Sequence, residues 1–314
     1  MIIIQLKDLH ALILFNLYYN FSMEVFNTLD KNLDLKNISL ALGFFDGVHR
    51  GHQEVILSAK NITNSKSAVV TFKKHPLEIL GYKCEYITST SKRAKLIEQL
   101  GIDYLFELEF TLDIAKMSGE DYINHLVNYF KPAHITTGFN HTFGRNKSAG
   151  VQTLEEFQNK YNYKYTQIPP QRLDNEVISS TKIREYLSKG DIKMANAMLG
   201  YNFQLSGTVV EGLNLGTKIG FPTANINYPN AIVKIPYGVY SSKVNGLKSI
   251  TNYGEKPTVS DAKIPVVESH ILNFDKQMYN ENIEIDFVKR IRDEKKFKSI
   301  DELKAQINED IKNA

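Results

Sequence analysis

The sequence predicts an α/β domain with a parallel sheet, followed by a mostly antiparallel β-barrel domain and a C-terminal helix. Short apolar segments alternate with amphipathic ones from residue 38 to residue 168, which implies parallel strands joined by right-handed crossovers. From residue 204 the pattern changes to short β-like runs separated by Gly, Pro and Asn. A length of 314 residues suits two domains.

The expected strands of the first domain are short segments rich in β-branched and aromatic residues: Ile38–Phe45, Ala68–Phe72, Asp103–Leu108, His134–Gly138 and Tyr163–Ile168. The segments between them predict helices: Gln53–Asn61, Ser91–Leu100, Gly119–Phe130 and Thr153–Tyr161. In the third of these helices, Tyr122, Leu126, Val127 and Phe130 recur on one face at helical spacing.

The second half follows a predicted helix at Ser180–Leu187 and a turn at Gly190-Asp191. Its β-like runs are Gln204–Glu211, Gly238–Val244, Val266–Phe274 and Ile283–Arg290. An apolar stripe of Ile300, Leu303, Ile307 and Ile311 predicts the closing helix. We therefore expect an N-terminal extension at residues 1–22, a first domain at 23–187 and a second at 188–314.

The extension is apolar but interrupted by Lys7, Asp8 and His10, and it has neither the cationic start nor the cleavage site of a signal peptide. Its uninterrupted apolar stretch, Ala11–Tyr19, is too short to span a bilayer. Met23 is an alternative start. We leave the role of this segment open and expect no membrane partner.

Charge and cysteine content narrow the classes of function. The formal charge is +3, from 38 Lys and Arg against 35 Asp and Glu, which argues against a protein that coats nucleic acid. The single cysteine, Cys84, excludes an internal disulfide and a zinc site built from cysteines. One cysteine also fits a reducing compartment, so we expect a cytoplasmic protein.

The first chemical motif is the segment Gly43–His52, GFFDGVHRGH, which follows the first predicted strand and opens a helix. A helix N-terminus offers free N–H groups and the positive end of a dipole to a phosphate. His49 and His52 can direct two imidazoles at one anionic centre and stabilise charge on a phosphoryl oxygen. The alternatives are an ordinary turn with two histidines, or a metal site for which no third ligand is evident.

Three further segments have both a chemical and an ordinary interpretation. His75-Pro76 fits a loop after a strand, and Asn140 at a strand end suits either a base or phosphate contact or a simple turn. Ser179, Ser180 and Thr181 are plausible N-cap residues of the helix that carries Arg184 one turn later.

The segment Gly212–Asn225, GLNLGTKIGFPTAN, joins two β-like runs. A glycine-rich flap lets backbone N–H groups approach a phosphate. Thr223 and Asn225 offer two oxygen donors from same-side positions, which Mg²⁺ accepts. A β-turn with solvated polar residues fits the same residues.

Taken together, these motifs resemble, in order, those of the bacterial bifunctional riboflavin kinase/FMN adenylyltransferase (FAD synthetase) family. The matching segments are Gly43–His52 with its HxGH signature, Thr71–Pro76, Gly138–Gly144, Ser179–Arg184, Gly220–Asn225, Pro236–Tyr240, Thr251–Gly254, Val267–His270 and Arg292–Glu294 with Phe297. The resemblance covers residues 38–312 and implies a Rossmann-like nucleotidylyltransferase domain followed by a riboflavin kinase barrel. The implied reactions are phosphorylation of riboflavin to FMN and adenylylation of FMN to FAD, with ATP as co-substrate and Mg²⁺ as cofactor.

The resemblance also implies roles for individual residues. His49, His52 and Arg184 would stabilise adenylyl transfer and the leaving pyrophosphate, and Glu268 would be the general base of the kinase step. The implied ATP-binding residues are Gly43, Phe45, Asp46, Gly47, Gly51, Asn140, Ser180, Thr181, Gly216 and Gly220. Asn252 and Arg292 would bind the flavin, and Thr223 and Asn225 the metal.

Some positions depart from the family pattern. Lys74 stands where proline is common, His141 where phenylalanine is frequent, Thr217 where arginine is often found, and Tyr253 where a small aliphatic residue is usual. We expect Thr217 to weaken phosphate or flap contacts and Tyr253 to reshape access of the flavin. The alternatives are therefore an adenylyltransferase with a weakened kinase module and a non-catalytic flavin-sensing protein. We expect small-molecule substrates, no nucleic acid partner, and a monomer or weak homo-oligomer.

Overall fold

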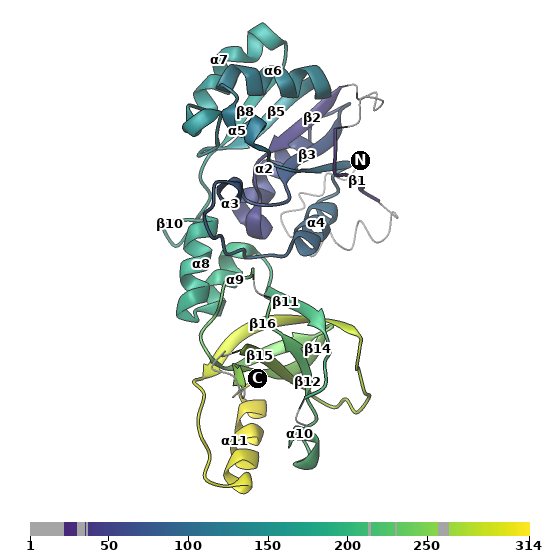
Figure 1. Cartoon of the computed structure of the whole chain (residues 1–314), viewed down its shortest axis with the longest axis vertical. Helices are drawn as coiled ribbons and strands as arrows, with labels where there is room; N and C mark the ends of the chain where they lie inside the picture. Colours follow the sequence, from purple (N-terminus) through teal and green to yellow (C-terminus); the bar gives the residue numbers. More distant parts are fainter. Residues whose placement is uncertain (1–21, 30–34, 36, 213–214, 230, 257–263) are drawn as a thin grey trace. The chain divides into compact units, whose positions relative to one another are not determined.

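The computed structural model describes residues 22–29, 35, 37–212, 215–229, 231–256 and 264–314 (Figure 1). The chain forms two compact units. The first runs to Cys84 and resumes over Ser89–Ser179, and the second combines Glu85–Thr88 with Ser180–Ala314. Except for Ser22, the predicted N-terminal extension lies outside the described residues, as do Leu213 and Asn214 of the glycine-rich segment.

The first unit contains a parallel sheet with the strand order β1-β4-β3-β2-β5-β8 (Figure 1). The strands in this order are β1 Glu24–Phe26, β4 Tyr104–Leu108, β3 Lys66–Phe72, β2 Ile38–Leu42, β5 Pro132–Gly138 and β8 Lys164–Ile168. Each adjacent pair is parallel. Every residue of β2 is buried, as expected for a central strand covered on both faces.

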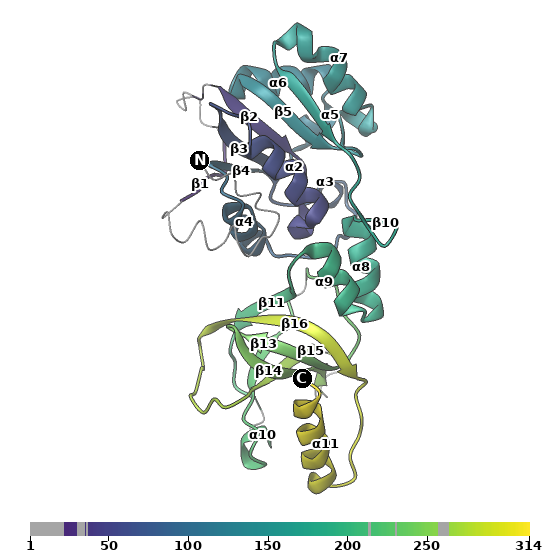
Figure 2. The same ribbon diagram turned by 180° about the vertical axis from the view of Figure 1, so that it is seen from behind.

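Helices between the strands bury the sheet: α2 Arg50–Lys60, α4 Thr90–Gln99, α6 Gly119–Phe130 and α7 Val151–Tyr161. Helix α2 packs against β2, β3 and β5 (Figure 2). On α6, Ile123, Leu126 and Phe130 join the core cluster that contains Leu40 and Leu42 of β2. Ser118 caps this helix by accepting a hydrogen bond from the amide of Asp121 at 3.1 Å.

Shorter elements complete the first unit. They are η1 Asp46–Val48, α3 Pro76–Ile79, α5 Leu112–Lys116, β6 Thr142–Phe143, η2 Arg145–Lys147, β7 Ala149–Gly150, β9 Arg172–Leu173 and β10 Glu176–Val177.

The strand order places the predicted motifs at one edge of the sheet. From β2 the chain steps to β3 and β4 on one side, then crosses over to β5 and β8 on the other. In parallel sheets, ligands bind outside the carboxyl ends of the strands at such a reversal. The segments after β2, β3 and β5, which carry His49, His75 and Asn140, all leave the sheet at this edge.

The second unit begins with α8 Ser180–Lys189 and α9 Ile192–Leu199, continues with a six-stranded antiparallel barrel, and ends with α11 Ile300–Lys312. In spatial order the strands are β11 Phe203–Thr208, β16 Asn282–Arg292, β13 Gly238–Val244, β14 Leu247–Lys256, β15 Ile264–Ile271 and β12 Ala224–Asn227. The amide of Val210 donates to the carbonyl of Asn225 at 2.8 Å, which links the chain after β11 to β12 and nearly closes the barrel.

Hydroxyl groups form part of the barrel core. Ser242 of β13 lies 2.7 Å from both Ser249 and Thr251 of β14, measured between side-chain oxygens, and Thr251 lies 2.7 Å from Ser269 of β15. All four residues are buried. The chain of hydrogen bonds therefore satisfies these polar groups inside the barrel and ties three neighbouring strands together.

The predicted fold class is confirmed, with differences in individual elements. The first strand ends at Leu42 and not at Phe45, because Phe45 adopts a left-handed conformation with φ of 56°. The sequence patterns did not identify β1, β12, β14 and α9. Among the described residues, no helix combines the length and apolar character needed to cross a bilayer.

We predict that Thr251→Val destabilises the barrel by about 1–3 kcal/mol, because the hydroxyl of Ser269 then loses its partner. Thermal and urea unfolding followed by circular dichroism measures the change. Thr208→Val, an exposed change in β11, is the matched control. Equal stability of the two variants would contradict the proposed contribution of the hydroxyl chain.

Candidate active sites

The first candidate site is built around His49 and His52. His49 is the N-cap of α2, and its Nδ1 accepts a hydrogen bond from the amide of His52 at 3.2 Å. The two imidazoles are stacked, with ring centroids 3.6 Å apart and an interplanar angle of 17°. Both rings therefore lie together at the N-terminus of a helix, where anions bind favourably.

The hydrogen bond at His49 determines which ring nitrogen can donate. Because Nδ1 accepts from a backbone amide, the proton of the neutral imidazole is carried on Nε2. His49 is 5% exposed, so neighbouring residues restrict the ring. In this tautomer Nε2 is the hydrogen-bond donor of the ring, which is the role that an anion-binding imidazole needs.

The lack of a side chain at position 51 has a steric explanation. A Cβ atom at Gly51 would lie 3.2 Å from Cε1 and 3.3 Å from Nδ1 of His49. A larger residue would crowd the imidazole that caps the helix. The spacing of the HxGH motif therefore places two histidines on one helix turn and removes the side chain that would crowd the first.

The other predicted residues of this site lie around the same sheet edge. Gly43, Phe45, Asp46 and Gly47 form the segment between β2 and α2, where Asp46 is buried and Gly47 has φ of 79°. Asn140 is exposed in the turn after β5. Among the described residues, no group of three or more His, Cys, Asp and Glu side chains is arranged to hold a metal, so the metal alternative for the two histidines gains no support.

Three predicted nucleotide-binding residues lie in helix α8, which belongs to the second unit: Ser180, Thr181 and Arg184. The Nε atom of Arg184 donates to the carbonyl of Glu85 at 2.8 Å.

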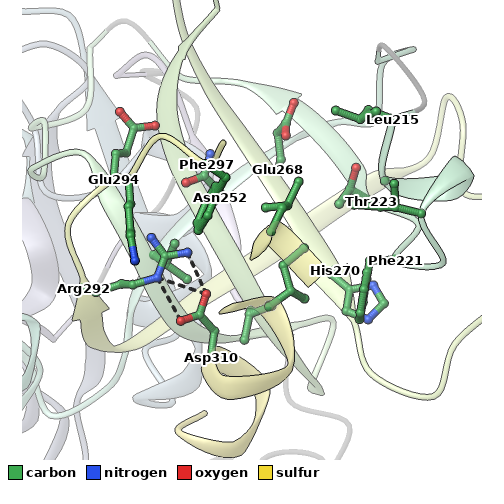
Figure 3. Close-up of a pocket in the computed structure, with 17 residues that line it drawn as sticks. Leu215, Phe221, Thr223, Asn252, Glu268, His270, Arg292, Glu294, Phe297 and Asp310 are labelled. Atoms are coloured by element: carbon green, nitrogen blue, oxygen red, sulfur yellow. Dashed lines mark hydrogen bonds and ion pairs between the residues drawn. The ribbon is translucent and has the colours of Figure 1, made fainter. Parts of the chain in front are cut away.

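The second candidate site is a cavity of about 320 Å³ in the barrel unit (Figure 3). Residues from four sources line it: the segment Leu215–Thr223, the barrel strands, the loop after β16, and α11. The predicted residues among them are Gly216, Thr223, Asn252, Glu268 and Arg292. The structure therefore brings together the predicted flap, base and flavin-binding residues in one cavity.

Strand register places the base candidate between two asparagines. Glu268 on β15 pairs with Asn225 on β12 and with Asn252 on β14. Directly opposite residues of antiparallel strands share a face of the sheet. Glu268 is half-buried and borders the cavity (Figure 3).

The donor set at Thr223 and Asn225 fits a hard divalent cation. Asn225 is 4% exposed, and its Oδ1 atom is buried without a hydrogen-bond donor among the described residues. A buried carbonyl oxygen without a donor is costly unless something else satisfies it. Oxygen donors from an amide and a hydroxyl are ligands that Mg²⁺ accepts.

Arg292 is fixed by a carboxylate that the sequence patterns did not identify. Its Nε lies 2.9 and 3.1 Å from the two carboxylate oxygens of Asp310, and its Nη2 lies 2.7 Å from Oδ2 (Figure 3). Asp310 is 1% exposed and comes from the last turn of α11. Asp310 follows Ile307 by three residues. A charged residue beside the apolar stripe of this helix is the sequence feature that could have identified it.

Glu294 and His270, which belong to matched motifs but were given no individual role, also line the cavity. Burial raises the pKa of Glu294, and a hydrogen bond from Asn252 partly opposes that shift. His270 contacts the end of the flap, because its Nδ1 lies 2.8 Å from the carbonyl oxygen of Pro222. The cavity therefore holds several ionisable groups beside the base candidate.

The flap has a close backbone approach at Gly216. Its carbonyl accepts from the amide of Phe221 at 2.8 Å, and a Cβ atom on Gly216 would lie 2.3 Å from the carbonyl oxygen of Phe221. The predicted Gly220 has φ of 89° in the same turn. Thr217 is exposed in α10 Leu215–Lys218.

The expectation that Tyr253 reshapes access of the flavin is wrong. Tyr253 is fully buried and packs against Tyr228 and Tyr237, with ring centroids 4.8 and 4.9 Å away. It is not among the residues that line the cavity, whereas its neighbour Asn252 is. Alternation along β14 directs adjacent side chains to opposite faces, which explains the difference.

Comparison with known proteins assigns both units. The family model described as FAD synthetase matches residues 31–182, and the one described as riboflavin kinase matches residues 199–314. The chain belongs to the bifunctional riboflavin kinase/FMN adenylyltransferase family. Like other members, it phosphorylates riboflavin to FMN and adenylylates FMN to FAD.

Relatives of this family match most of the chain. The bifunctional riboflavin kinase/FMN adenylyltransferase of Bacillus subtilis is 36% identical over 88% of this chain and 90% of its own length. The Listeria monocytogenes protein of the same name is 32% identical over 90% and 93%, and that of Escherichia coli K12 is 31% identical over 86% and 90%. A solved structure described as a macrolide-efflux protein from Streptococcus pneumoniae is similar with a TM-score of 0.84 and 26% identity, covering 92% of this chain and 98% of that one.

His141 gives the first unit a pH-dependent stability. Burial lowers the pKa of His141 from near 6.5 to about 4, and its Nε2 is buried without a hydrogen-bond partner among the described residues. Because the folded protein disfavours the protonated ring, the stability present above pH 6.5 is lost as the pH falls towards 4.

We predict that His141→Phe raises the free energy of unfolding by about 2 kcal/mol more at pH 5 than at pH 8. The reason is that the variant has no proton to bind at this position. Thermal unfolding from pH 8 to pH 5 measures the difference. His125→Gln, at an exposed position, is the control. A stability difference between variant and parent that does not change with pH would contradict the assignment.

Proposed function

We propose that the two reactions of the family take place at the two candidate sites, adenylyl transfer at His49 and His52 and phosphoryl transfer in the barrel cavity. The observation that supports the first assignment is the stacked pair of imidazoles at the N-terminus of α2. An FMN phosphate oxygen would attack the α-phosphorus of ATP in line, and the bond to pyrophosphate would break. The imidazoles would stabilise the charge on the transferring group, and no covalent enzyme intermediate is needed.

In the barrel, Glu268 would take the proton from the ribityl 5′-hydroxyl as its oxygen attacks the γ-phosphorus of ATP, and ADP would leave. Support comes from the position of Glu268 at the cavity wall between Asn225 and Asn252. Asn252 and Arg292 would contact the flavin, and Gly216 and Gly220 would let the flap backbone approach the phosphates.

Thr223 and Asn225 would hold Mg²⁺, which supplies charge neutralisation for the ATP phosphates when bound. Support comes from the buried Asn225 Oδ1, which has no donor among the described residues. The chain itself then contributes the two oxygen donors, the base and the residues that orient the flavin.

The resemblance supports the remaining assignments. We assign Gly43, Phe45, Asp46, Gly47, Gly51, Asn140, Ser180 and Thr181 to ATP and Arg184 to the leaving pyrophosphate. A boundary between residues 187 and 188, a cytoplasmic location and a monomer or weak homo-oligomer stay predictions.

We predict that the two sites can be inactivated separately. The double variant His49→Ala/His52→Ala should lower FAD formation from FMN by about 100-fold or more and leave FMN formation from riboflavin unchanged. Glu268→Gln should do the opposite, because it removes the base without changing the adenylyl site. Chromatography of flavins after separate incubations with riboflavin and with FMN measures both. Unchanged FAD formation in the double variant would refute the adenylyl-transfer site.

We predict that Asn225→Ala raises the Mg²⁺ concentration needed for half-maximal kinase activity by about 10-fold or more, since one oxygen donor is lost. The Mg²⁺ dependence of FAD formation from FMN should stay the same. Asn227→Ala, an exposed asparagine in the same strand, is the matched control. If both variants keep the parental Mg²⁺ dependence, Asn225 is not a metal ligand.

A further inference from the structure

Arg93 is a buried arginine outside every motif considered so far. It lies in α4 and is 3% exposed. Its Nη2 donates to Glu107 Oε1 of β4 and to the carbonyl of Phe72, the last residue of β3, both at 2.7 Å. Its Nη1 donates to the carbonyl of Phe44 at 3.2 Å. One guanidinium thus contacts the carboxyl-terminal ends of two strands and the segment that follows β2.

Phe44 is held from several directions. Its carbonyl oxygen also accepts a hydrogen bond from Thr71 Oγ1 at 2.9 Å. The guanidinium carbon of Arg93 lies 4.8 Å from the centre of the Phe44 ring, which fits a cation–π contact. The Phe44 ring also contacts His75 edge-on, with ring centroids 4.7 Å apart.

The segment that Arg93 holds carries backbone strain. Phe45 has φ of 56° and Val48 has φ of 36°, conformations that a bulky or β-branched residue rarely adopts. Such residues persist only where surrounding contacts enforce them. The bonds to the Phe44 carbonyl fix the peptide that immediately precedes Phe45, and so act directly beside the strained residue.

The strained segment leads directly to the histidines. The Phe45 ring packs over Gly43, where a Cβ atom would lie 2.9 Å from the ring. It also meets the His52 ring edge-on at 5.3 Å, and His52 stacks on His49. A shift of the Phe44 peptide would therefore move the aromatic ring that supports the imidazole pair.

We propose that Arg93, with Glu107 as its counter-ion, is a positioning residue for adenylyl transfer, acting through the Phe44 carbonyl on His49 and His52. The proposal rests on the proposed function of the two histidines. A lysine could keep the ion pair with Glu107, but its single ammonium lacks the planar fork that reaches carbonyls on two segments and a carboxylate at once. The shape of the guanidinium is therefore the required property.

The test compares Arg93→Lys, Arg93→Met and the control Lys95→Met, an exposed change on the same helix. We expect Arg93→Lys to lower kcat for FAD formation from FMN by about 10-fold and Arg93→Met by more, with KM for ATP and FMN changed by less than about 3-fold. FMN formation from riboflavin takes place in the other unit and should be unchanged, and thermal unfolding followed by circular dichroism checks that the first unit is folded in each variant. Equal kcat in Arg93→Lys and the parent would overturn the proposal.

A second arm separates positioning from a general loss of structure. We introduce Arg93→Lys into a His49→Ala/His52→Ala background and measure the same reaction. If Arg93 acts through the histidines, the second change costs less than about 2-fold there, since the coupled group is already gone. The same 10-fold loss in both backgrounds would overturn the proposal. If instead the His49→Ala/His52→Ala background itself leaves FAD formation intact, the proposed role of the histidines fails, which is a distinguishable result.

Discussion

The common direction of β2, β3 and β5 is the constraint on which the first candidate site depends. Because the strands are parallel, the segments carrying His49, His75 and Asn140 leave the sheet at one edge. The same direction brings the carbonyls of Phe44 and Phe72 within reach of one guanidinium. The helix N-terminus at α2 and the stacked imidazoles follow from this alignment and from the strained turn that connects β2 to α2.

Each unit has an ion pair beside its candidate site, and in each pair the arginine and the carboxylate come from different elements. The pair of the first unit is buried, whereas in the second only the carboxylate is buried. Arg93 pairs with Glu107 in the first unit, and Arg292 pairs with Asp310 in the second. Desolvation of both charges offsets much of their attraction, so such pairs contribute little net stability. Their value lies in geometry, because a bidentate or branched guanidinium fixes the orientation of groups that border a ligand.

The sequence predicted the parts of the molecule in which periodicity and local motif agree. The parallel strands and their helices, the barrel and the closing helix all followed from apolar patterns. Strand β14 was missed because Ser249 and Thr251 are buried hydroxyls, so its inward face does not look apolar. Strand β1 is only three residues long and gives no periodic signal.

The motifs identified functional residues that lie close together in the sequence. They did not identify the interaction partners that only the fold brings to those residues. Glu107 lies within an apolar strand and Asp310 beside an apolar helix stripe. In the sequence neither carboxylate lies near the arginine that it pairs with in the fold. Tyr253 is the converse case. Its departure from the family pattern suggested an effect on access of the flavin, whereas the strand directs its side chain to the core.

We propose that one chain transfers two different phosphorus groups of ATP at two sites. Incubation of the protein with riboflavin, Mg²⁺ and ATP labelled at either the α- or the γ-phosphorus tests it most directly. We expect the γ-label to enter FMN and to be retained in FAD, and the α-label to enter FAD alone. Label from the α-phosphorus in FMN, or FAD formed from riboflavin without γ-label, would contradict it.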